Sequence, residues 1–158
     1  MANTPHIALA ETPAQILAVR EVFLDYLRFI EAYLGQSLDF QGTEREFADF
    51  PQTYDALWLA EIDGEAIGAV GLKPFDAGRA ELKRLYVRPE GRGYGIGLAL
   101  CEACILAARS HGYETLLLDT DHGLTHANAI YERLGFRDIE RYYNNPMDSR
   151  FMALSLSP

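Results

Sequence analysis

Apolar residues recur at every third or fourth position in the first third of the chain, the spacing that places them on one helix face. The pattern covers residues 16–34 and predicts an amphipathic helix, which follows a capping box at Thr12–Gln15 and ends at Gly35. A second capping box at residues 43–46 predicts a short helix. Residues 6–10 are expected to form a short strand before the first helix.

The middle of the chain has an extended pattern. Residues 56–62 and 65–72 are rich in apolar side chains and are separated by Asp63-Gly64. This dipeptide favours a type I′ turn, so the two runs predict a β-hairpin. A further strand is expected over residues 79–87, after a short connection.

The last part of the chain alternates between the two patterns. We expect helices over residues 98–108 and 126–134, and strands over residues 115–120, 137–143 and 150–156. The resulting order, β-α-α-β-β-β-α-β-α-β-β, predicts a mixed α/β fold. The early strands should be antiparallel, and a strand–helix–strand crossover should lie in the middle.

Length, charge and hydropathy favour a single domain and argue against a nucleic-acid-binding or membrane-spanning protein. The chain has 158 residues, so residues 1–158 are expected to form a single domain. It carries 23 acidic and 14 basic residues, a net charge of −9, which argues against nucleic-acid binding. No apolar stretch reaches about 18 residues, so no membrane span is expected. The sequence leaves a homodimer open.

Two cysteines bear on the compartment. Cys101 and Cys104 lie within an apolar helix and have no second cysteine pair or histidine cluster to complete a metal site. Core packing of reduced thiols is therefore expected, with no metal. The N-terminus has no basic segment followed by an apolar run, so no secretory signal is visible. Together these features predict a cytoplasmic protein.

A glycine-rich stretch is the strongest candidate for a ligand site. Residues 81–97 read ELKRLYVRPEGRGYGIG, so a strand runs into a loop with glycine at positions 91, 93, 95 and 97, directly before a helix. The first amides of a helix are unpaired and its dipole is positive there, while glycine lets backbone approach a ligand closely. This arrangement predicts a phosphate or pyrophosphate site.

Two well-known phosphate motifs do not fit. A P-loop requires a Gly-Lys pair, and the chain has none. A dinucleotide fingerprint requires a third glycine where this chain has Leu98 or Leu100, although Asp119 ends the next strand as a ribose-binding acid would. The dinucleotide alternative therefore stays open, as does a packing role for the glycines without any ligand.

Two other motifs do fit a known family. The segment Arg92–Gly97 reads R-x-x-G-x-G, and residues 127–136 read ANAIYERLGF, with Tyr131 followed by Gly-Phe. In this order the motifs resemble the GNAT superfamily of acyl-CoA-dependent N-acyltransferases, and the element order resembles the GNAT fold over nearly the whole chain. The resemblance implies a single-domain GNAT-like α/β fold with a mostly antiparallel sheet flanked by helices. It also implies acetyl-CoA as co-substrate.

The same resemblance implies a set of cofactor-binding residues. The loop amides would bind the pyrophosphate, with the Arg92 side chain as a counter-charge, and the central strand would bind the pantetheine arm through its backbone. The N–H near Val87 would polarise the thioester carbonyl. Many members have a cofactor-binding asparagine where this chain has Leu124, so Asn128 is a candidate substitute. The implied residues are Leu85, Tyr86, Val87, Arg92, Gly93, Tyr94, Gly95, Ile96, Gly97 and Asn128.

Two catalytic residues follow from the resemblance and from the chemistry of amines. An amine of pKa about 10.4 must lose a proton before it can attack at neutral pH, and a nearby carboxylate can accept that proton. Glu81 lies eleven residues before Arg92, where histone-modifying members carry their general base; the alternative is a solvated strand-edge carboxylate. Tyr131 has the family's position for the acid that serves the leaving thiolate; the alternative is a packed aromatic ring. A secondary base role for His122 or His126 also stays open.

Two hypotheses of function follow. The first is an enzyme that transfers an acetyl group from acetyl-CoA to a primary amine of a small molecule or peptide, by direct attack. The second is a non-catalytic module that binds acyl-CoA. The presence of both Glu81 and Tyr131 favours the enzyme.

Overall fold

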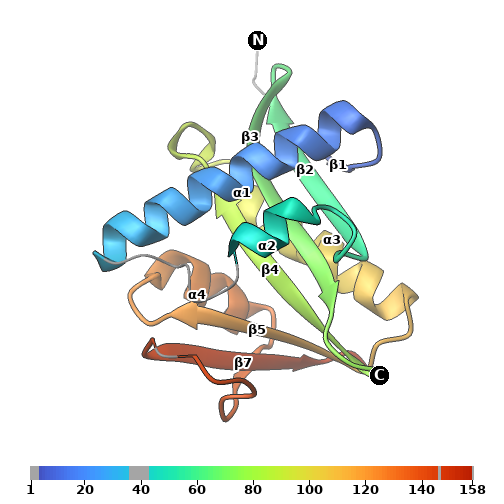
Figure 1. The fold of residues 1–158 in the computed structure, drawn as a ribbon, viewed down its shortest axis with the longest axis vertical. Helices are drawn as coiled ribbons and strands as arrows, with labels where there is room; N and C mark the ends of the chain where they lie inside the picture. Colours follow the sequence, from blue (N-terminus) through green and yellow to red (C-terminus); the bar gives the residue numbers. More distant parts are fainter. Residues whose placement is uncertain (1–3, 36–42, 146, 158) are drawn as a thin grey trace.

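The computed structural model describes residues 4–35, 43–145 and 147–157. A seven-stranded sheet forms its centre, in the order β1-β2-β3-β4-β5-β7-β6 (Figure 1). The β4–β5 pair is parallel and every other neighbouring pair is antiparallel. The predicted mixed, mostly antiparallel α/β fold is therefore confirmed. The strands are β1 His6–Leu9, β2 Ala56–Ile62, β3 Glu65–Pro74, β4 Arg79–Val87, β5 Thr115–Asp121, β6 Arg137–Asp138 and β7 Ser149–Ser155.

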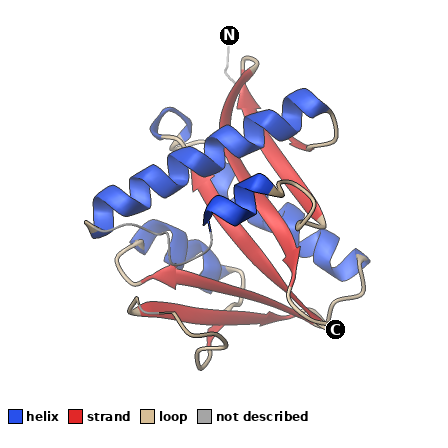
Figure 2. Cartoon of the chain, in the orientation of Figure 1, coloured by secondary structure: helices blue, strands red, loops and turns tan. Residues whose placement is uncertain are grey.

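Helices cover both faces of the sheet, as Figure 2 shows. They are α1 Pro13–Leu34, α2 Thr43–Ala48, α3 Ile96–Ser110 and α4 Thr125–Arg133. The core is accordingly split in two. One buried cluster joins α1 to β2 and β3 through residues such as Phe23 and Leu59, and a larger one joins α3 and α4 to the other face through residues such as Leu100 and Leu118. No described helix is both long and apolar enough to cross a membrane.

Local signals in the sequence set the first helix and the hairpin. The Thr12 side chain accepts from Gln15 N–H, and the Gln15 side chain accepts from Thr12 N–H, which completes the predicted capping box. Gly35 ends α1 in a left-handed conformation, at φ 70°. Asp63 and Gly64 have φ of 52° and 80°, and positive φ at both central positions is what a type I′ turn requires.

A β-bulge interrupts β4. Lys83 and Tyr86 are three positions apart on β4, while their partners on β3, Gly71 and Ala69, are two positions apart. The extra residue is accommodated by Arg84, which has φ of 61°. The bulge reverses which side chains face α3: Leu82 does so before it, and Leu85 after it. Residues on one face of a regular strand are an even number of positions apart, so the spacing of three between these leucines is the sign of the bulge in the sequence.

The strand predicted at residues 137–143 is much shorter than expected. Only Arg137 and Asp138 pair with β7, and one further backbone bond joins Ile139 N–H to the Phe151 carbonyl. After that the chain leaves the sheet edge. The hydroxyls of Tyr142 and Tyr143 donate instead to carboxylates on β4 and β5, which turns this segment over the face of the sheet.

The bulge residue forms a buried ion pair with α2. The Arg84 guanidinium donates to Glu46 Oε1 at 2.7 Å, and the two side chains are only 6% and 7% exposed. Tyr54 donates to the other carboxylate oxygen at 2.6 Å. Burial raises the pKa of Glu46, but the Arg84 charge and hydrogen bonds outweigh it, so the pKa lies below its usual value. The pair ties α2 to the centre of the sheet.

Removing the Glu46 carboxylate should strongly destabilise the fold, because the Arg84 charge would lose a buried counter-charge. We expect Glu46→Ala to lower the free energy of unfolding by roughly 3–5 kcal/mol in urea denaturation at pH 7. The matched control is Glu21→Ala, since Glu21 pairs with Arg20 at the surface and should cost less than about 1 kcal/mol.

The pH dependence of this loss has a defined sign. A lowered folded-state pKa stabilises the protein above the unfolded value of about 4.3, and this contribution disappears as pH falls through the folded-state pKa. The difference between wild type and Glu46→Ala should therefore shrink in acid. An equal difference at neutral and acidic pH would contradict the assigned charge interaction.

Candidate active site

Strands β4 and β5 pair over only three positions and then separate. The paired residues are Arg79 with Thr115, Ala80 with Leu116 and Glu81 with Leu117. Beyond them the two strands spread apart from their common end, as Figure 1 shows. We call this opening the fork. The second half of β4 therefore has a backbone edge on the β5 side that no strand of the described chain covers, and such an edge is a template for an extended ligand.

The residues predicted to contact a pantetheine arm line this edge. Leu85 and Val87 pack toward the α3 side of the sheet, and Tyr86 packs toward α1, where its ring lies 5.6 Å from that of Tyr26. The Arg88 N–H donates to the Ile67 carbonyl on β3 at 2.7 Å. Because successive amides point in opposite directions along a strand, the Val87 N–H is directed into the fork.

The glycine-rich loop leads from β4 into α3. A single turn of 3₁₀ helix, Pro89–Gly91, comes first, and it uses the Gly91 and Arg92 amides in internal bonds to Arg88 and Pro89 carbonyls. The first bond of α3 runs from Ala99 N–H to the Gly95 carbonyl at 3.1 Å. The amides of the first helical turn therefore stay open to a ligand. What Arg92 can offer a ligand is its exposed side chain.

The four glycines of the loop have two different roles. Two adopt a left-handed backbone, and two allow close packing against neighbouring elements. Gly93 and Gly95 are exposed, have φ of 90° and 73°, and would place a Cβ in open space. Their left-handed backbone is the reason for glycine there. A Cβ on Gly91 would lie 1.9 Å from Ile67 Cγ2, and one on Gly97 would lie 3.1 Å from Ile130 Cδ1. These two let the loop and α3 lie close to β3 and α4.

Glu81 lies at the base of the fork. It is the last residue of β4 that pairs with β5, and only 8% of it is exposed. Its Oε2 accepts a hydrogen bond from the Tyr142 hydroxyl at 2.8 Å. No other hydrogen bond to its carboxylate is made by the described residues, so Oε1 remains available.

Tyr131 approaches the fork from α4. It is 6% exposed, and its ring packs edge-on against Phe136. Burial raises its pKa well above the usual value, helped by the nearby Cys101 thiol and by Tyr26 and Asp119. Tyr26 belongs to α1, on the other face of the sheet. In the described part of the chain, the Tyr131 hydroxyl has no hydrogen-bond partner.

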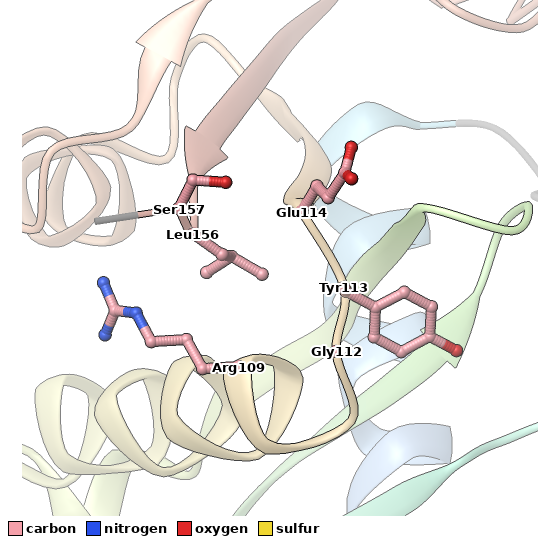
Figure 3. A pocket seen from close by; sticks show the side chains of 6 residues that line it. All are labelled: Arg109, Gly112, Tyr113, Glu114, Leu156 and Ser157. Atoms are coloured by element: carbon pink, nitrogen blue, oxygen red, sulfur yellow. The ribbon is translucent and has the colours of Figure 1, made fainter.

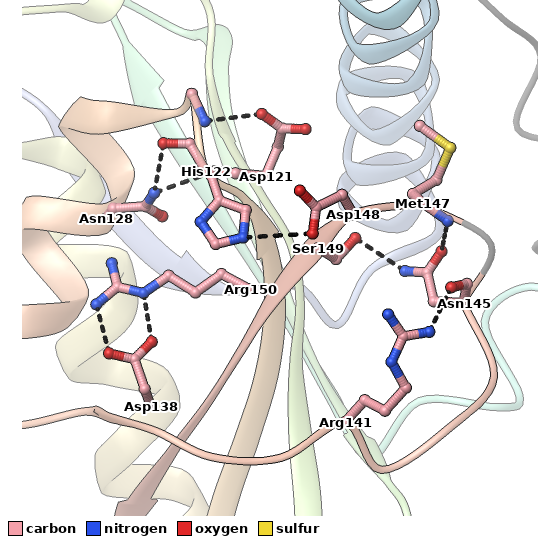
Figure 4. Close-up of polar contacts among 11 residues, drawn as sticks. Asp121, His122, Asn128, Asp138, Arg141, Asn145, Met147, Asp148, Ser149 and Arg150 are labelled. Atoms are coloured by element: carbon pink, nitrogen blue, oxygen red, sulfur yellow. Dashed lines mark hydrogen bonds and ion pairs between the residues drawn. The ribbon is translucent and has the colours of Figure 1, made fainter.

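Asn128 has a structural task at the start of α4. Its Oδ1 accepts from the Thr120 hydroxyl, and its Nδ2 donates to the carbonyls of Asp121 and His122 (Figure 4). These bonds hold the turn that follows β5. The expected contact with a cofactor stays a prediction, but the polar atoms of this amide are already engaged within the protein.

The other candidate groups lie outside the fork. Cys101 and Cys104 are fully buried, as expected for core residues, and burial raises the pKa of the Cys101 thiol to about 12. His122 is exposed beside Asp148. Among the described residues, no group of three or more His, Cys, Asp or Glu side chains is arranged to hold a metal ion. The open pocket of Figure 3 is lined by Arg109, Gly112, Tyr113, Glu114, Leu156 and Ser157, at the far end of α3 from the glycine loop.

Sequence reasoning missed the hydrogen bonds made at and beside Glu81. Tyr142 and Glu81 are 61 residues apart, and no local pattern relates them. Asp119 was considered only as a ribose-binding acid, whereas here its Oδ2 accepts from the Tyr143 hydroxyl at 2.8 Å. A pair of adjacent tyrosines in a segment expected to be a strand was the one visible sign.

Comparisons with known proteins agree on one family. The profile of the "Acetyltransferase (GNAT) family" matches residues 18–136. An uncharacterized N-acetyltransferase of Schizosaccharomyces pombe is 36% identical over 143 residues, covering 84% of this chain and 88% of that protein. A GNAT-family acetyltransferase of Staphylococcus aureus has the same fold, with a TM-score of 0.79 and 19% identity over 98% of this chain and all of the other.

Some solved neighbours were crystallised with acetyl-CoA or CoA. One of them is a GNAT-family acetyltransferase from Brucella melitensis in complex with acetyl-CoA, with a TM-score of 0.69 and 22% identity. The match covers 99% of this chain and 91% of that one. At this level of identity the likeness shows the shared fold.

The close packing of Gly91 is open to a direct test. Gly91→Ala should lower the free energy of unfolding by about 1–3 kcal/mol, because the new methyl group would overlap Ile67. Gly78→Ala is the matched control, since a Cβ there would meet its nearest neighbour, Glu114, at 3.7 Å. Urea denaturation measures the free energy of unfolding of both variants. Equal values for Gly91→Ala and Gly78→Ala would show that the loop does not depend on the close contact of Gly91 with Ile67.

Proposed function

The chain belongs to the acetyltransferase (GNAT) family, and from this premise we propose that it transfers the acetyl group of acetyl-CoA to a primary amine of a small molecule or peptide. In this proposal the amine attacks the thioester directly. One observation carries it: Glu81 lies at the base of a fork whose β4 strand leads to an open helix N-terminus, and the nearly buried Tyr131 has a hydroxyl without a hydrogen-bond partner among the described residues.

The residues present fit acetyl-CoA as a substrate. The exposed loop and the free first-turn amides of α3 suit a pyrophosphate, and the Arg92 side chain can neutralise it. The uncovered edge of β4 at residues 85–87 suits the amide groups of a pantetheine arm, which would add to the sheet like a strand. The Val87 N–H, directed into the fork, then serves the thioester carbonyl.

Glu81 supplies the base. Freeing a neutral amine of pKa about 10.4 at pH 7 costs roughly 4–5 kcal/mol, which a carboxylate in reach can offset. Glu81 takes a proton from the ammonium group, directly or through water, and the nitrogen lone pair attacks the carbonyl carbon. The carbon–sulfur bond breaks as the carbon–nitrogen bond forms.

Tyr131 serves the leaving sulfur. Its raised pKa keeps the phenol protonated at neutral pH, so it is always a hydrogen-bond donor. Tyr131 gives its proton to the thiolate as the carbon–sulfur bond breaks. The phenol then regains a proton from the second N–H proton that the amine loses. Overall, an ammonium group and a thioester become an amide, a thiol and one proton, which leaves from Glu81.

Removal of the carboxylate should slow the reaction in a pH-dependent way. With an amine that the wild-type protein acetylates, Glu81→Gln should lower kcat about 10²-fold or more at pH 7. The ratio of wild-type to variant kcat should shrink as pH approaches the pKa of the amine. Thiol release from acetyl-CoA measures this rate. Glu114→Gln is the matched control, because Glu114 is an exposed carboxylate far from the fork.

The same assay distinguishes an enzyme from a binding module. Tyr131→Phe should lower kcat at every pH, because a donor to sulfur does not depend on the charge of the amine. Wild-type protein that binds acetyl-CoA in calorimetry, yet releases no thiol with any primary amine in a broad panel, would favour a non-catalytic module.

A further inference from the structure

The hydroxyl of Tyr142 contacts the carboxylate of Glu81 at the base of the fork. Its Oη donates to Glu81 Oε2 at 2.8 Å, and Oε1 receives no hydrogen bond from the described residues. We propose that Tyr142 is a positioning residue for Glu81, which occupies one carboxylate oxygen and leaves the other directed at the acceptor amine. This inference rests on the proposed function, since it assigns Glu81 as the base.

Tyr142 is suited to this role because its ring is fixed by other rings. Phe75 and Phe151 contact it edge-on, with centroids 5.1 and 5.2 Å from its own, and Tyr143 lies at 5.5 Å. Interplanar angles of 60–84° match the preferred edge-to-face geometry of aromatic pairs. A ring held on several sides leaves the hydroxyl little freedom to leave the carboxylate.

The segment that carries Tyr142 is itself anchored. Asn145 is 1% exposed, and its Nδ2 donates to the hydroxyls of Tyr143 and Ser149 at 3.0 Å each. Its Oδ1 accepts from Met147 N–H, and its carbonyl accepts from the Arg141 guanidinium (Figure 4). A buried amide with all these partners fixes the turn, so the position of Tyr142 does not depend on a bound acceptor.

Electrostatics keep the hydroxyl in its donating form. Burial raises the pKa of Tyr142 far above its usual value, and the Glu81 charge raises it further. The phenol is therefore protonated wherever the carboxylate is ionised. The other charged or titratable groups that face this pair are Lys73 across β3, Arg79 on β4, Asp119 on β5 and Tyr143 beside it.

The bond has a measurable consequence for the base. A donor to an ionised carboxylate favours the ionised form, and loss of the donor leaves a nearly buried oxygen unsatisfied. Tyr142→Phe removes the hydroxyl and keeps the ring, so the aromatic packing and the fold should be retained.

The neighbouring residue supplies a matched comparison. Tyr143 donates to the Asp119 carboxylate over the same 2.8 Å and packs against the same Phe151 ring. Tyr143→Phe therefore removes a hydrogen bond of the same length from a different carboxylate. It also removes one acceptor of Asn145 Nδ2, which keeps the Ser149 hydroxyl as its partner. It should leave the acid limb of the rate profile at its wild-type position, whatever it does to the KM for the amine.

The test compares pH profiles of kcat and kcat/KM for wild type and the two variants, with thiol release as the readout. For Tyr142→Phe we expect kcat at pH 7 to fall about tenfold and the acid limb to move up by about one pH unit, with an unchanged KM for acetyl-CoA. A wild-type profile for Tyr142→Phe, or the same displacement in both variants, would overturn the proposal.

A second measurement does not depend on turnover. The carboxyl carbon-13 resonance of Glu81 should be displaced in Tyr142→Phe relative to wild type, because the carboxylate loses a hydrogen-bond donor, and Tyr143→Phe should leave it unmoved. If wild type acetylates no amine, the proposed function fails, while this resonance still decides whether Tyr142 controls the Glu81 carboxylate. An unmoved resonance in Tyr142→Phe refutes that control.

Discussion

The early end of pairing between β4 and β5 is the constraint on which the site depends. Three rungs join the strands, and the bulge at Arg84 then adds a residue to β4 alone. A bulge bends a strand and increases its local twist, which carries the rest of β4 away from β5. The buried Arg84–Glu46 pair holds the bulged part of β4 against α2. Helix α2 thereby supports the opening between β4 and β5 without lining it.

The fork divides the site into two environments with different requirements. Its far end is exposed backbone at the glycine loop, where unpaired amides and an arginine suit a highly charged phosphate. Its base is nearly buried, and there a carboxylate and tyrosine hydroxyls lie among aromatic rings. An anion is held best where backbone donors are accessible, and a proton is moved best where little water competes. One strand, β4, serves both because it runs from one environment into the other.

Three tyrosines near the fork are held in their neutral form. Burial raises the pKa of Tyr26 to about 12 and that of Tyr131 and Tyr142 above their usual values, so all three are neutral donors at physiological pH. Neutral donors add no charge beside Glu81, whose cross-strand neighbour on β3 is Lys73.

Local patterns in the sequence determined the helices, both caps of α1, the Asp63-Gly64 hairpin and the glycine loop, because each rests on contacts within a few residues. The two motifs, Arg92–Gly97 and residues 127–136, further indicated the family. Only the tertiary structure decided the rest: the pairing of Glu46 with Arg84, the early exit of the chain after Asp138, the internal use of Asn128 and the bond from Tyr142 to Glu81. These features join residues from 8 to 61 positions apart or depend on such contacts. Neither periodicity nor propensity extends over those separations, so they were settled by packing across the sheet.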